Sequence, residues 1–301
     1  MNPKKHLVVG IGEVLWDMLP TGKQLGGAPA NFAYFAHALG DDCAIVSRVG
    51  RDADGREIGE RFTTTGVASN FLQFDDEHST GKVVVETDVQ GQPHYNILED
   101  VAWDYLEWSA ELERLAARAD AVCWGTLAQR SVRTRETIMR FIEATRDDAV
   151  RIFDVNLRQS FFSAELLATS IHLANVIKLN HEELPRVLCA LGLNDKTRTE
   201  ADQAQELLNY AAGVNVVCIT RGERGSLLLS RSERIEHAGL KTRVVDTVGA
   251  GDAFTAMLAH GLLRGEPLPH ISERANRIGA WVASQTGATP PIEEDLLKQI
   301  A

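Results

Sequence analysis

The chain has 301 residues, of which 44% are hydrophobic and 24% charged, a composition typical of a soluble globular protein with a large core. Its formal net charge of −11 argues against a nucleic-acid partner, because the phosphate backbone binds basic surfaces. No apolar run approaches the ~18 residues of a membrane span, and the N-terminal segment lacks the long apolar stretch of a signal peptide, so we expect a cytoplasmic protein that binds no membrane.

Short runs rich in valine and isoleucine recur along the chain, and helical patterns separate most of them. The expected strands lie within residues 6–12, 43–50, 119–125, 150–156, 175–180, 214–220 and 242–248. The expected helices span residues 52–65, 134–145, 164–173, 181–191, 200–211, 252–264 and 268–285. Near-continuous apolar strands alternating with helices predict an α/β fold, a mostly parallel sheet with helices on both faces. In such folds, ligands bind at the carboxyl ends of the strands.

One region breaks this alternation. Residues 67–102 contain no convincing helix, but segments such as GKVVVETDV alternate in polarity around a turn at QGQP, which predicts β-hairpins. Together with residues 13–27 they are expected to form a small separate sheet, either a lid or an oligomer contact. The predicted division is therefore an α/β body of residues 1–12, 28–66 and 103–301, and a lid of residues 13–27 and 67–102.

The stretch DTVGAGDAFTA, residues 246–256, places two glycines and an aspartate at the start of a predicted helix. Backbone N–H groups at such a start are unpaired and can bind an anion. Asp252 lies in the same turn and can accept a proton from a hydroxyl held nearby. The alternative is structural, since aspartate favours a first helical turn and glycines make a tight turn.

A second glycine pair opens the helix in QLGGAPANFAYFAHALG, delimited by Pro29 and Gly40. The amide of Asn31 can donate and accept hydrogen bonds, which suits a polyhydroxyl ligand, although a local hydrogen bond to the turn is the alternative. Asp17 lies in an otherwise apolar strand-like run. Either it is the solvent-facing residue of an edge strand, or it belongs to the lid and binds the hydroxyl groups of a sugar. Sequence periodicity does not decide between these two.

Three further segments end strands or join them. In KLNHEEL, Asn180 and Glu183 have the spacing of a capping box, and a role near a metal or a phosphate is the alternative. ITRGERGSLLL is typical of a strand, a turn and a strand. DVNLRQS leaves Asp154, Asn156 and Arg158 at the end of a strand, where a parallel sheet presents residues to ligands.

Other motifs are absent or incomplete. GIGEVL has Leu15 where a dinucleotide-binding GxGxxG would have a third glycine, and PTGKQ is not a P-loop. The four cysteines form no CxxC pair, which argues against a zinc site or a disulfide framework. No HExxH or GxSxG motif indicates a metalloprotease or a hydrolase.

Taken together, the motifs resemble the two signatures of the ribokinase/pfkB family of carbohydrate kinases. The stretch GGAPANFAYFAHALG, which begins at Gly26, resembles one signature, and DTVGAGDAFTA, which begins at Asp246, resembles the other. The segments DVNLR, KLNHEE and TRGERG lie between them in the family's order. The similarity covers essentially the whole chain. It implies a Rossmann-like, ribokinase-like three-layer α/β fold with a β-sheet lid. It also implies transfer of the γ-phosphoryl group of ATP to a sugar hydroxyl.

The resemblance also implies roles for the matching positions. Asp252 would be the general base, and Gly249, Ala250 and Gly251 would form the anion hole. The sugar would be bound by Asp17, Gly26, Gly27, Asn31, Arg158 and Asp252. The nucleotide would be bound by Asn180, Thr220, Gly222, Gly225, Gly249, Gly251 and Asn276. Glu183 would hold Mg²⁺ through water.

Many family members also bind K⁺ beside the anion hole, largely through carbonyl oxygens. The matching positions in this chain are Asp246, Val248, Val282, Gln285 and Gly287. Where some members supply a serine, this chain has Pro291, which departs from the pattern. Lids of the family often pair, so a homodimer through the lid is a further expectation.

The motifs GGAPAN, GEVLWDMLP and DVNLRQSFF resemble bacterial fructokinases most, so D-fructose is the expected acceptor. Kinases of 2-keto-3-deoxygluconate and other ribokinase-type sugar kinases share this pattern, and specificity would depend on lid and loop residues such as Tyr95, Asn96 and Trp103. An acidic sugar would need a second cation besides Arg158. Two other classes are alternatives. An NAD-dependent oxidoreductase would explain the α/β pattern but not Asp252, and a non-catalytic sugar or nucleotide sensor would need a damaged anion hole.

Overall fold

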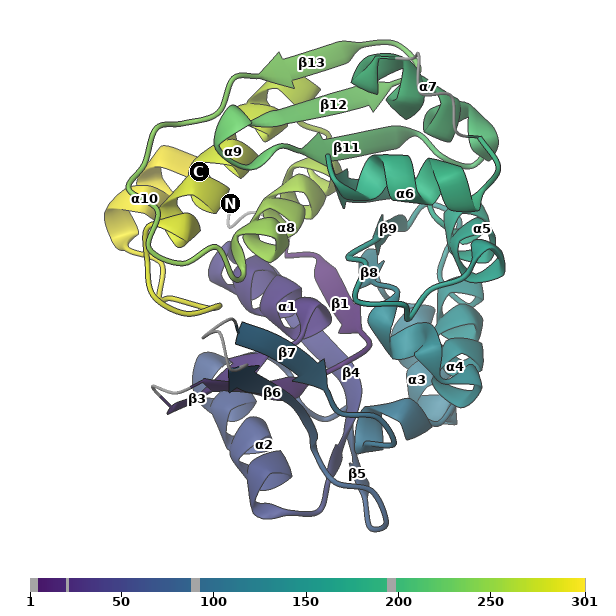
Figure 1. The fold of residues 1–301 in the computed structure, drawn as a ribbon, viewed down its shortest axis with the longest axis vertical. Coiled ribbons are helices and arrows are strands. Elements are labelled where there is room, and N and C mark those ends of the chain that lie inside the picture. The colour runs from purple at the N-terminus through teal and green to yellow at the C-terminus, as the bar shows by residue number, and fades with distance from the viewer. Residues whose placement is uncertain (1–4, 20–21, 88–92, 194–198, 301) are drawn as a thin grey trace.

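The computed structural model of the protein describes residues 5–19, 22–87, 93–193 and 199–300. Its main feature is a nine-stranded sheet with the order β13-β12-β11-β10-β9-β8-β1-β4-β5 (Figure 1). The strands are β1 (Leu7–Ile11), β4 (Asp42–Gly50), β5 (Leu72–Asp75), β8 (Ala121–Trp124), β9 (Val150–Asp154), β10 (Val176–Asn180), β11 (Val216–Thr220), β12 (Ser226–Ser230) and β13 (Arg234–His237). Only the pairs β11–β12 and β12–β13 are antiparallel, so the sheet is mostly parallel, as the sequence predicts.

Helices cover both faces of this sheet. They are α1 (Ala28–Ala38), α2 (Ala53–Thr65), α3 (Ala110–Ala116), α4 (Val132–Glu143), α5 (Ala164–Leu173), α6 (Glu183–Ala190), α7 (Glu200–Tyr210), α8 (Ala250–Leu263), α9 (Leu268–Ala283) and α10 (Glu294–Ile300). Because side chains alternate along a strand, Val9 of β1 packs into one core with Phe141 of α4, whereas Val8 packs into another with Met257 of α8. The predicted three-layer α/β fold is therefore confirmed.

A second sheet has four strands in the order β3-β2-β6-β7. These strands are β2 (Leu15–Leu19), β3 (Gly22–Gly26), β6 (Gly81–Thr87) and β7 (Pro93–Ile97). Lys23 and Lys82 both form ion pairs with Asp54 of α2, and the Trp16 indole N–H donates to the Asp54 carbonyl at 3.1 Å. Figure 1 shows this sheet beside α2, at one end of the molecule.

The predicted lid range 67–102 was too wide. Strand β5 pairs with β4 in the nine-stranded sheet, and the Gly50 N–H donates to the Thr80 hydroxyl at 3.0 Å. The chain therefore stays with the main body until Thr80 and enters the second sheet at Gly81. Leu72 is buried, whereas Phe74, two residues on and therefore on the same face of the strand, is exposed, so the segment has no clean alternation that would assign it to either sheet.

The predicted strand at 242–248 was wrong. This segment is irregular, and the side chains of Val244 and Val245 are 56% and 55% exposed. The N–H groups of Val245 and Asp246 donate to the carbonyl of Ala283 at the end of α9, at 2.8 and 3.3 Å, instead of pairing with a strand. The segment is therefore held by the end of α9 and does not extend the sheet beyond its edge strand β13.

Most predicted helices lie within a few residues of the observed ones, but α3 and the short 3₁₀ turns Ala102–Tyr105, Leu127–Arg130 and Gly222–Arg224 were not predicted. The short, charged α3 carries its own start signal, since the Ser109 hydroxyl accepts the Leu112 N–H at 3.3 Å. Among the described residues, no helix combines the length and the apolar character needed to cross a membrane.

Candidate active site

A cavity of about 1210 Å³ lies between the carboxyl ends of β10 and β11 and the helices α8 and α9. Six of the seven residues predicted for the nucleotide line it: Asn180, Thr220, Gly222, Gly225, Gly251 and Asn276. Ala250 lines it as well, whereas Gly249 does not. The position agrees with the expectation that ligands bind at the ends of parallel strands.

Several lining residues were missed by sequence reasoning. One group comes from α9, where Gly279, Ala280 and Ala283 line the cavity together with Asn276, which was predicted. Their spacing of three and four residues places them on one helix face, a pattern of small residues that could have been noticed. The other group is the segment 238–242 after β13, which carries no motif. The Asn276 amide donates to the Ser226 hydroxyl and to the Ser272 carbonyl, both at 2.7 Å.

The turn from β10 into α6 forms the reciprocal capping that was the structural alternative for Asn180 and Glu183. The Asn180 side-chain oxygen accepts the N–H groups of Glu182 and Glu183, each at 2.9 Å. The Glu183 carboxylate accepts the Asn180 N–H at 2.8 Å. Asn180 also lines the cavity, so the capping does not remove it from the candidate site.

Helix α8 begins at a glycine that no other residue could easily replace. Gly249 has φ +80°, in the left-handed region, and a Cβ there would collide with the carbonyl oxygen of Ala288. The Ala250 N–H makes a long bond of 3.3 Å to the Thr247 carbonyl. The remaining amides of this first turn have no intrahelical acceptors, which makes the turn an anion-binding position next to the cavity.

Asp252, in that first turn, is partly buried and held in place. The Asn31 side-chain amide donates a hydrogen bond to the Asp252 carboxylate at 2.8 Å, across 221 residues of sequence. Asn31 is therefore held by α8 and not by the local hydrogen bond to its own turn that was the alternative. Burial raises the pKa of Asp252 to about 6, and the Asp154 carboxylate adds to this. Lys178, the Asn31 amide and Arg158 act in the opposite direction. The carboxylate is therefore ionised at neutral pH but close to its titration range.

A buried ion pair lies beneath the start of α8. Lys178 of β10 and Asp154 of β9 are register partners, with the ammonium 3.0 and 3.1 Å from the carboxylate oxygens. The Thr255 hydroxyl, one turn after Asp252, donates to Asp154 at 2.8 Å. A Cβ on Gly251 would lie 3.1 Å from the Lys178 nitrogen, so the cation lies directly under the glycine turn.

Lys178 was not singled out from the sequence, although a lysine inside an apolar strand is an unusual signal. Burial disfavours its charge, but Asp154, Glu183 and Asp252 more than offset this and raise the pKa of Lys178 above its ordinary value. A charged lysine adds positive potential where the helix start already attracts anions.

The second glycine pair faces the other side of Asp252. Asp17 lies on β2, an inner strand of the second sheet and not the edge strand that was one alternative. Its carboxylate packs against Gly26 so closely that a side chain there would collide. Gly27 has φ +110° and meets the carbonyl oxygen of Glu13. Burial raises the pKa of Asp17 to about 6, Arg158 lowers it and Asp246 raises it.

Glu13 follows β1 and was not predicted as part of the site. It is 2% exposed, and its Oε2 has no hydrogen-bond partner. Burial raises its pKa to about 7, which hydrogen bonds from the backbone of Glu13 and Ala28 and the charge of Arg158 oppose. The charges of Arg158, a predicted sugar-binding residue, and of Asp252 both act on the Glu13 carboxyl group, which was not singled out from the sequence.

A model of the pfkB family of carbohydrate kinases matches residues 13–295. This chain belongs to that family. It is an ATP-dependent sugar kinase, a phosphotransferase that acts on a sugar hydroxyl. The oxidoreductase alternative is therefore wrong, and so is the non-catalytic sensor.

Three relatives place the chain within this family of kinases. It is 30% identical to the fructokinase of Salmonella typhimurium, over 96% of this chain and 97% of that one. It is 26% identical to the ATP-dependent 6-phosphofructokinase of Thermoanaerobacterium thermosaccharolyticum, over 95% and 91%. The crystal structure of an uncharacterized sugar kinase, PH1459 from Pyrococcus horikoshii, in complex with ATP superposes with a TM-score of 0.81, at 27% identity over 97% of each chain.

The kinase has few protein ligands for a metal ion. No group of three or more His, Cys, Asp or Glu side chains that could hold one occurs in the described ranges. Both oxygens of Glu183 already accept N–H groups, from Leu157 at 2.7 Å and from Asn180. The residues therefore fit an ion held mainly by phosphate oxygens and water, as Mg²⁺ usually is beside a nucleotide.

The residues predicted for K⁺ come from two neighbouring segments. The carboxylate of Asp246 accepts the Val248 N–H at 3.0 Å and the Gly287 N–H at 3.2 Å, and so ties the two segments together. Val282 and Gln285 meet at the end of α9, where the Gln285 N–H donates to the Val282 carbonyl at 2.9 Å. Neither contact involves Pro291.

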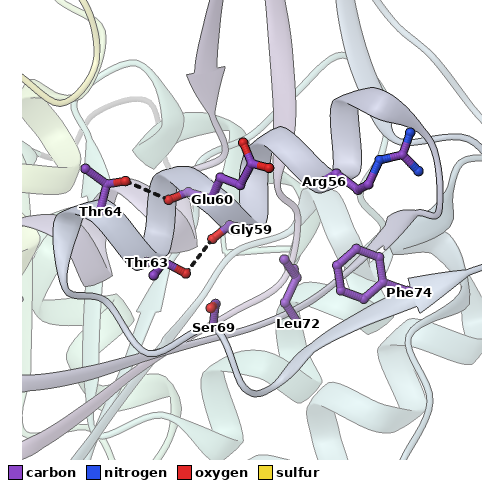
Figure 2. A pocket seen from close by; sticks show the side chains of 8 residues that line it. All are labelled: Arg56, Gly59, Glu60, Thr63, Thr64, Ser69, Leu72 and Phe74. Atoms are coloured by element: carbon purple, nitrogen blue, oxygen red, sulfur yellow. Dashed lines mark hydrogen bonds between the residues drawn. The ribbon is translucent and has the colours of Figure 1, made fainter.

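Trp103, which was expected near the acceptor, is instead 1% exposed and packs in the core. Tyr95 lies on β7, and its side chain lies outside the part of the chain that the structure describes. A second hollow of about 520 Å³ lies between α2 and residues 69–74 (Figure 2). Its Thr63 and Thr64 hydroxyls donate to carbonyls of their own helix, and none of the predicted site residues lines it.

Proposed function

We propose that the kinase phosphorylates D-fructose, with Asp252 as general base. The observation that carries the proposal is the position of Asp252. It lies in the first turn of α8, whose Ala250 and Gly251 line the cavity, and it is oriented by Asn31 from the opposite side. A base between a nucleotide cavity and a pocket of hydroxyl-binding groups is the arrangement that phosphoryl transfer requires.

In this mechanism Asp252 accepts the proton of the attacking hydroxyl. Its pKa of about 6 leaves it ionised at neutral pH and still a useful base. The amides of Gly249, Ala250 and Gly251 receive the charge on the transferring group, and Lys178 lies beneath them. Since the transition state is loose, positioning and charge neutralisation dominate over covalent chemistry.

The proposed sugar-binding groups favour an uncharged acceptor. Asp17 and Asp252 accept hydroxyl hydrogens, Gly26 and Gly27 allow close approach, and the Asn31 side-chain oxygen has no protein partner. Among the described residues, Arg158 is the one cation whose charge lowers the pKa of both Asp17 and Asp252. One cation among several carboxyl groups disfavours a sugar acid or a sugar phosphate, because like charges repel. The identity to a fructokinase supports fructose in particular.

For the nucleotide, we propose contacts from Asn180, Thr220, Gly222, Gly225, Gly249, Gly251 and Asn276. Mg²⁺ would neutralise the phosphate charge, with Glu183 bound to it through water. A K⁺ ion would lie against Asp246, Val248, Val282, Gln285 and Gly287. The second sheet, with its strands β2 and β6, is the proposed lid and the proposed contact of a homodimer.

The test is sugar-dependent release of ADP from MgATP, measured with and without K⁺. The panel should contain fructose, ribose, 2-keto-3-deoxygluconate, adenosine, tagatose and fructose 6-phosphate. We expect the highest kcat/KM with fructose and little activity with the two anionic acceptors. A stronger signal with another acceptor would reject fructose and leave the kinase activity in place.

A further inference from the structure

The loop after β9, residues 155–162, holds Arg158 in an unusual backbone. Asn156 and Gln159 have φ of +41° and +47°, and they are two of only three non-glycine residues with positive φ in the described part of the chain. Each such conformation costs about 1–3 kcal/mol unless its surroundings enforce it. Two of them flank Arg158, which is exposed. The loop is therefore held in place from outside.

Arg158 acts on three carboxyl groups that come from different elements. Its charge lowers the pKa of Glu13 after β1, of Asp17 on β2 and of Asp252 on α8. These groups surround the proposed acceptor position. A small displacement of the Arg158 loop would therefore change the charge balance where the sugar binds.

Glu183 is the main support of this loop. Its Oε1 accepts the Leu157 N–H at 2.7 Å, next to Arg158, and its Oε2 accepts the Asn180 N–H at 2.8 Å. The side chain is 6% exposed, and Asn180 lines the nucleotide cavity. One buried carboxylate thus joins the acceptor side of the site to the nucleotide side.

Two weaker contacts brace the same loop. The Thr126 hydroxyl donates to the Asn156 carbonyl at 3.2 Å. One turn along α6 from Glu183, the Arg186 guanidinium donates to the Gln159 carbonyl at 3.4 Å and packs over the Phe162 ring at 5.2 Å. Helix α6 therefore contacts the loop on both sides of Arg158.

We propose that Glu183 is a positioning residue that couples nucleotide binding to acceptor binding. When a nucleotide fixes the Asn180 turn, the shared carboxylate fixes Leu157 and thereby Arg158, so the acceptor binds more tightly. By linkage, the acceptor must tighten nucleotide binding by the same factor. The inference rests on the proposed acceptor site but not on which sugar occupies it, and it goes beyond a role of Glu183 toward Mg²⁺.

The chemistry of the contact suggests a sharp variant. Two N–H donors require an acceptor at each end, which a carboxylate provides. In Glu183→Gln, one oxygen becomes an NH₂ group that faces an N–H donor, so one of the two bonds is lost without a change of shape. Arg186→Met removes only the exposed brace and is expected to fold normally, so it provides a second, milder test.

The experiment is calorimetric titration of D-fructose, or of the panel sugar with the highest turnover, with and without a non-hydrolysable β,γ-imido ATP analogue at saturating Mg²⁺. The wild-type Kd for the sugar should fall about 5–150-fold when the analogue is present. In Glu183→Gln this ratio should approach one when the analogue is present at a concentration that saturates the variant. Arg186→Met should show an intermediate ratio, and thermal melting should confirm that both variants are folded.

Three outcomes would overturn the coupling. The first is a ratio of the sugar Kd values, without and with the analogue, that is the same in folded Glu183→Gln as in wild type. The second is a ratio that falls to one in Glu183→Gln but returns to the wild-type value with tenfold more Mg²⁺. The third is a ratio of one in the wild-type protein itself. The second outcome would assign Glu183 to the metal alone. If Glu183→Gln does not fold, a wild-type ratio in Arg186→Met would overturn it. A failure of the proposed function is a different result, because then no panel sugar would be phosphorylated.

Discussion

Helices α1 and α8 both begin at a glycine with positive φ, and their first turns meet where Asn31 donates to Asp252. What lies beneath the two starts differs. Under α8 lies the ammonium of Lys178, paired with Asp154. Beside the start of α1 lies the buried carboxyl group of Glu13, which has an unpartnered oxygen.

This difference explains how two similar turns can serve two substrates. A helix start above a cation attracts phosphate oxygens, whereas a helix start beside carboxyl groups attracts hydroxyl groups and repels anions. The Asn31–Asp252 hydrogen bond holds the two turns in register, with the proposed base at their boundary. Each of the following substitutions changes one side of this comparison.

The largest effect is expected at Asp252. We predict that Asp252→Asn lowers kcat by about 10²–10⁴-fold, because the base is lost, and leaves the Kd for MgATP nearly unchanged. Sugar-dependent ADP release and calorimetry measure the two quantities. The exposed Asp295→Asn is the matched control for the loss of one negative charge and should have wild-type kcat. A kcat of Asp252→Asn close to that control would exclude Asp252 as the base.

The next effect is on stability at Glu13. Its folded pKa of about 7 is above the ordinary value of 4.5, so the wild-type protein loses stability as pH rises from about 4.5 to 7. Glu13→Gln does not titrate, and above pH 7 it should be more stable than wild type by up to about 3 kcal/mol. Denaturant unfolding at pH 4 and at pH 8 measures this gap. A difference in unfolding free energy between the two proteins that is the same at both pH values would contradict a raised pKa for the buried Glu13 carboxyl group.

The start of α8 can be disturbed without a change of charge. Gly249→Ala places a methyl group against the Ala288 carbonyl, in addition to the cost of positive φ. Gly265 has φ +65° and open space around it, so Gly265→Ala isolates the backbone cost. We expect Gly249→Ala to be less stable than this control by about 1–3 kcal/mol and to lose turnover as well. Equal stability and equal kcat in the two variants would mean that the tight turn has no role in the site.

The smallest effect is expected at Asn31. Because its amide lowers the pKa of Asp252, Asn31→Ala should raise that pKa and move the acidic limb of kcat/KM upward from about pH 6. Loss of the oriented hydrogen bond should also lower kcat/KM by roughly tenfold at neutral pH. A pH–rate profile from pH 5 to 9 checks both, and an acidic limb that moves downward would contradict the assignment.

The sequence predicted the architecture because strands and helices carry local patterns. The apolar runs at β1, β8 and β9 and the glycine-opened α1 and α8 all lie where they were expected. Membership of the kinase family followed from two distant motifs that the fold brings together at Asn31 and Asp252. Local patterns failed where pairing partners decide the outcome, as for β5 and for residues 242–248.

The residues that sequence reasoning missed act through tertiary contacts. Lys178 stands in KLNHEE and Glu13 in GEVLWDMLP, but neither was singled out, because their importance depends on what is packed around them. For Glu183, the capping spacing was visible, but its second bond, to Leu157, crosses to another strand end. Strained φ angles beside Arg158 likewise appear only in three dimensions.

The most direct test is to follow the phosphoryl group itself by ³¹P NMR in a mixture of the protein, MgATP and D-fructose. The proposed mechanism predicts equal amounts of ADP and a fructose phosphomonoester, with both formed about 10²–10⁴-fold more slowly by Asp252→Asn. ADP accompanied only by inorganic phosphate, or a sugar phosphate that Asp252→Asn forms at the wild-type rate, would contradict it.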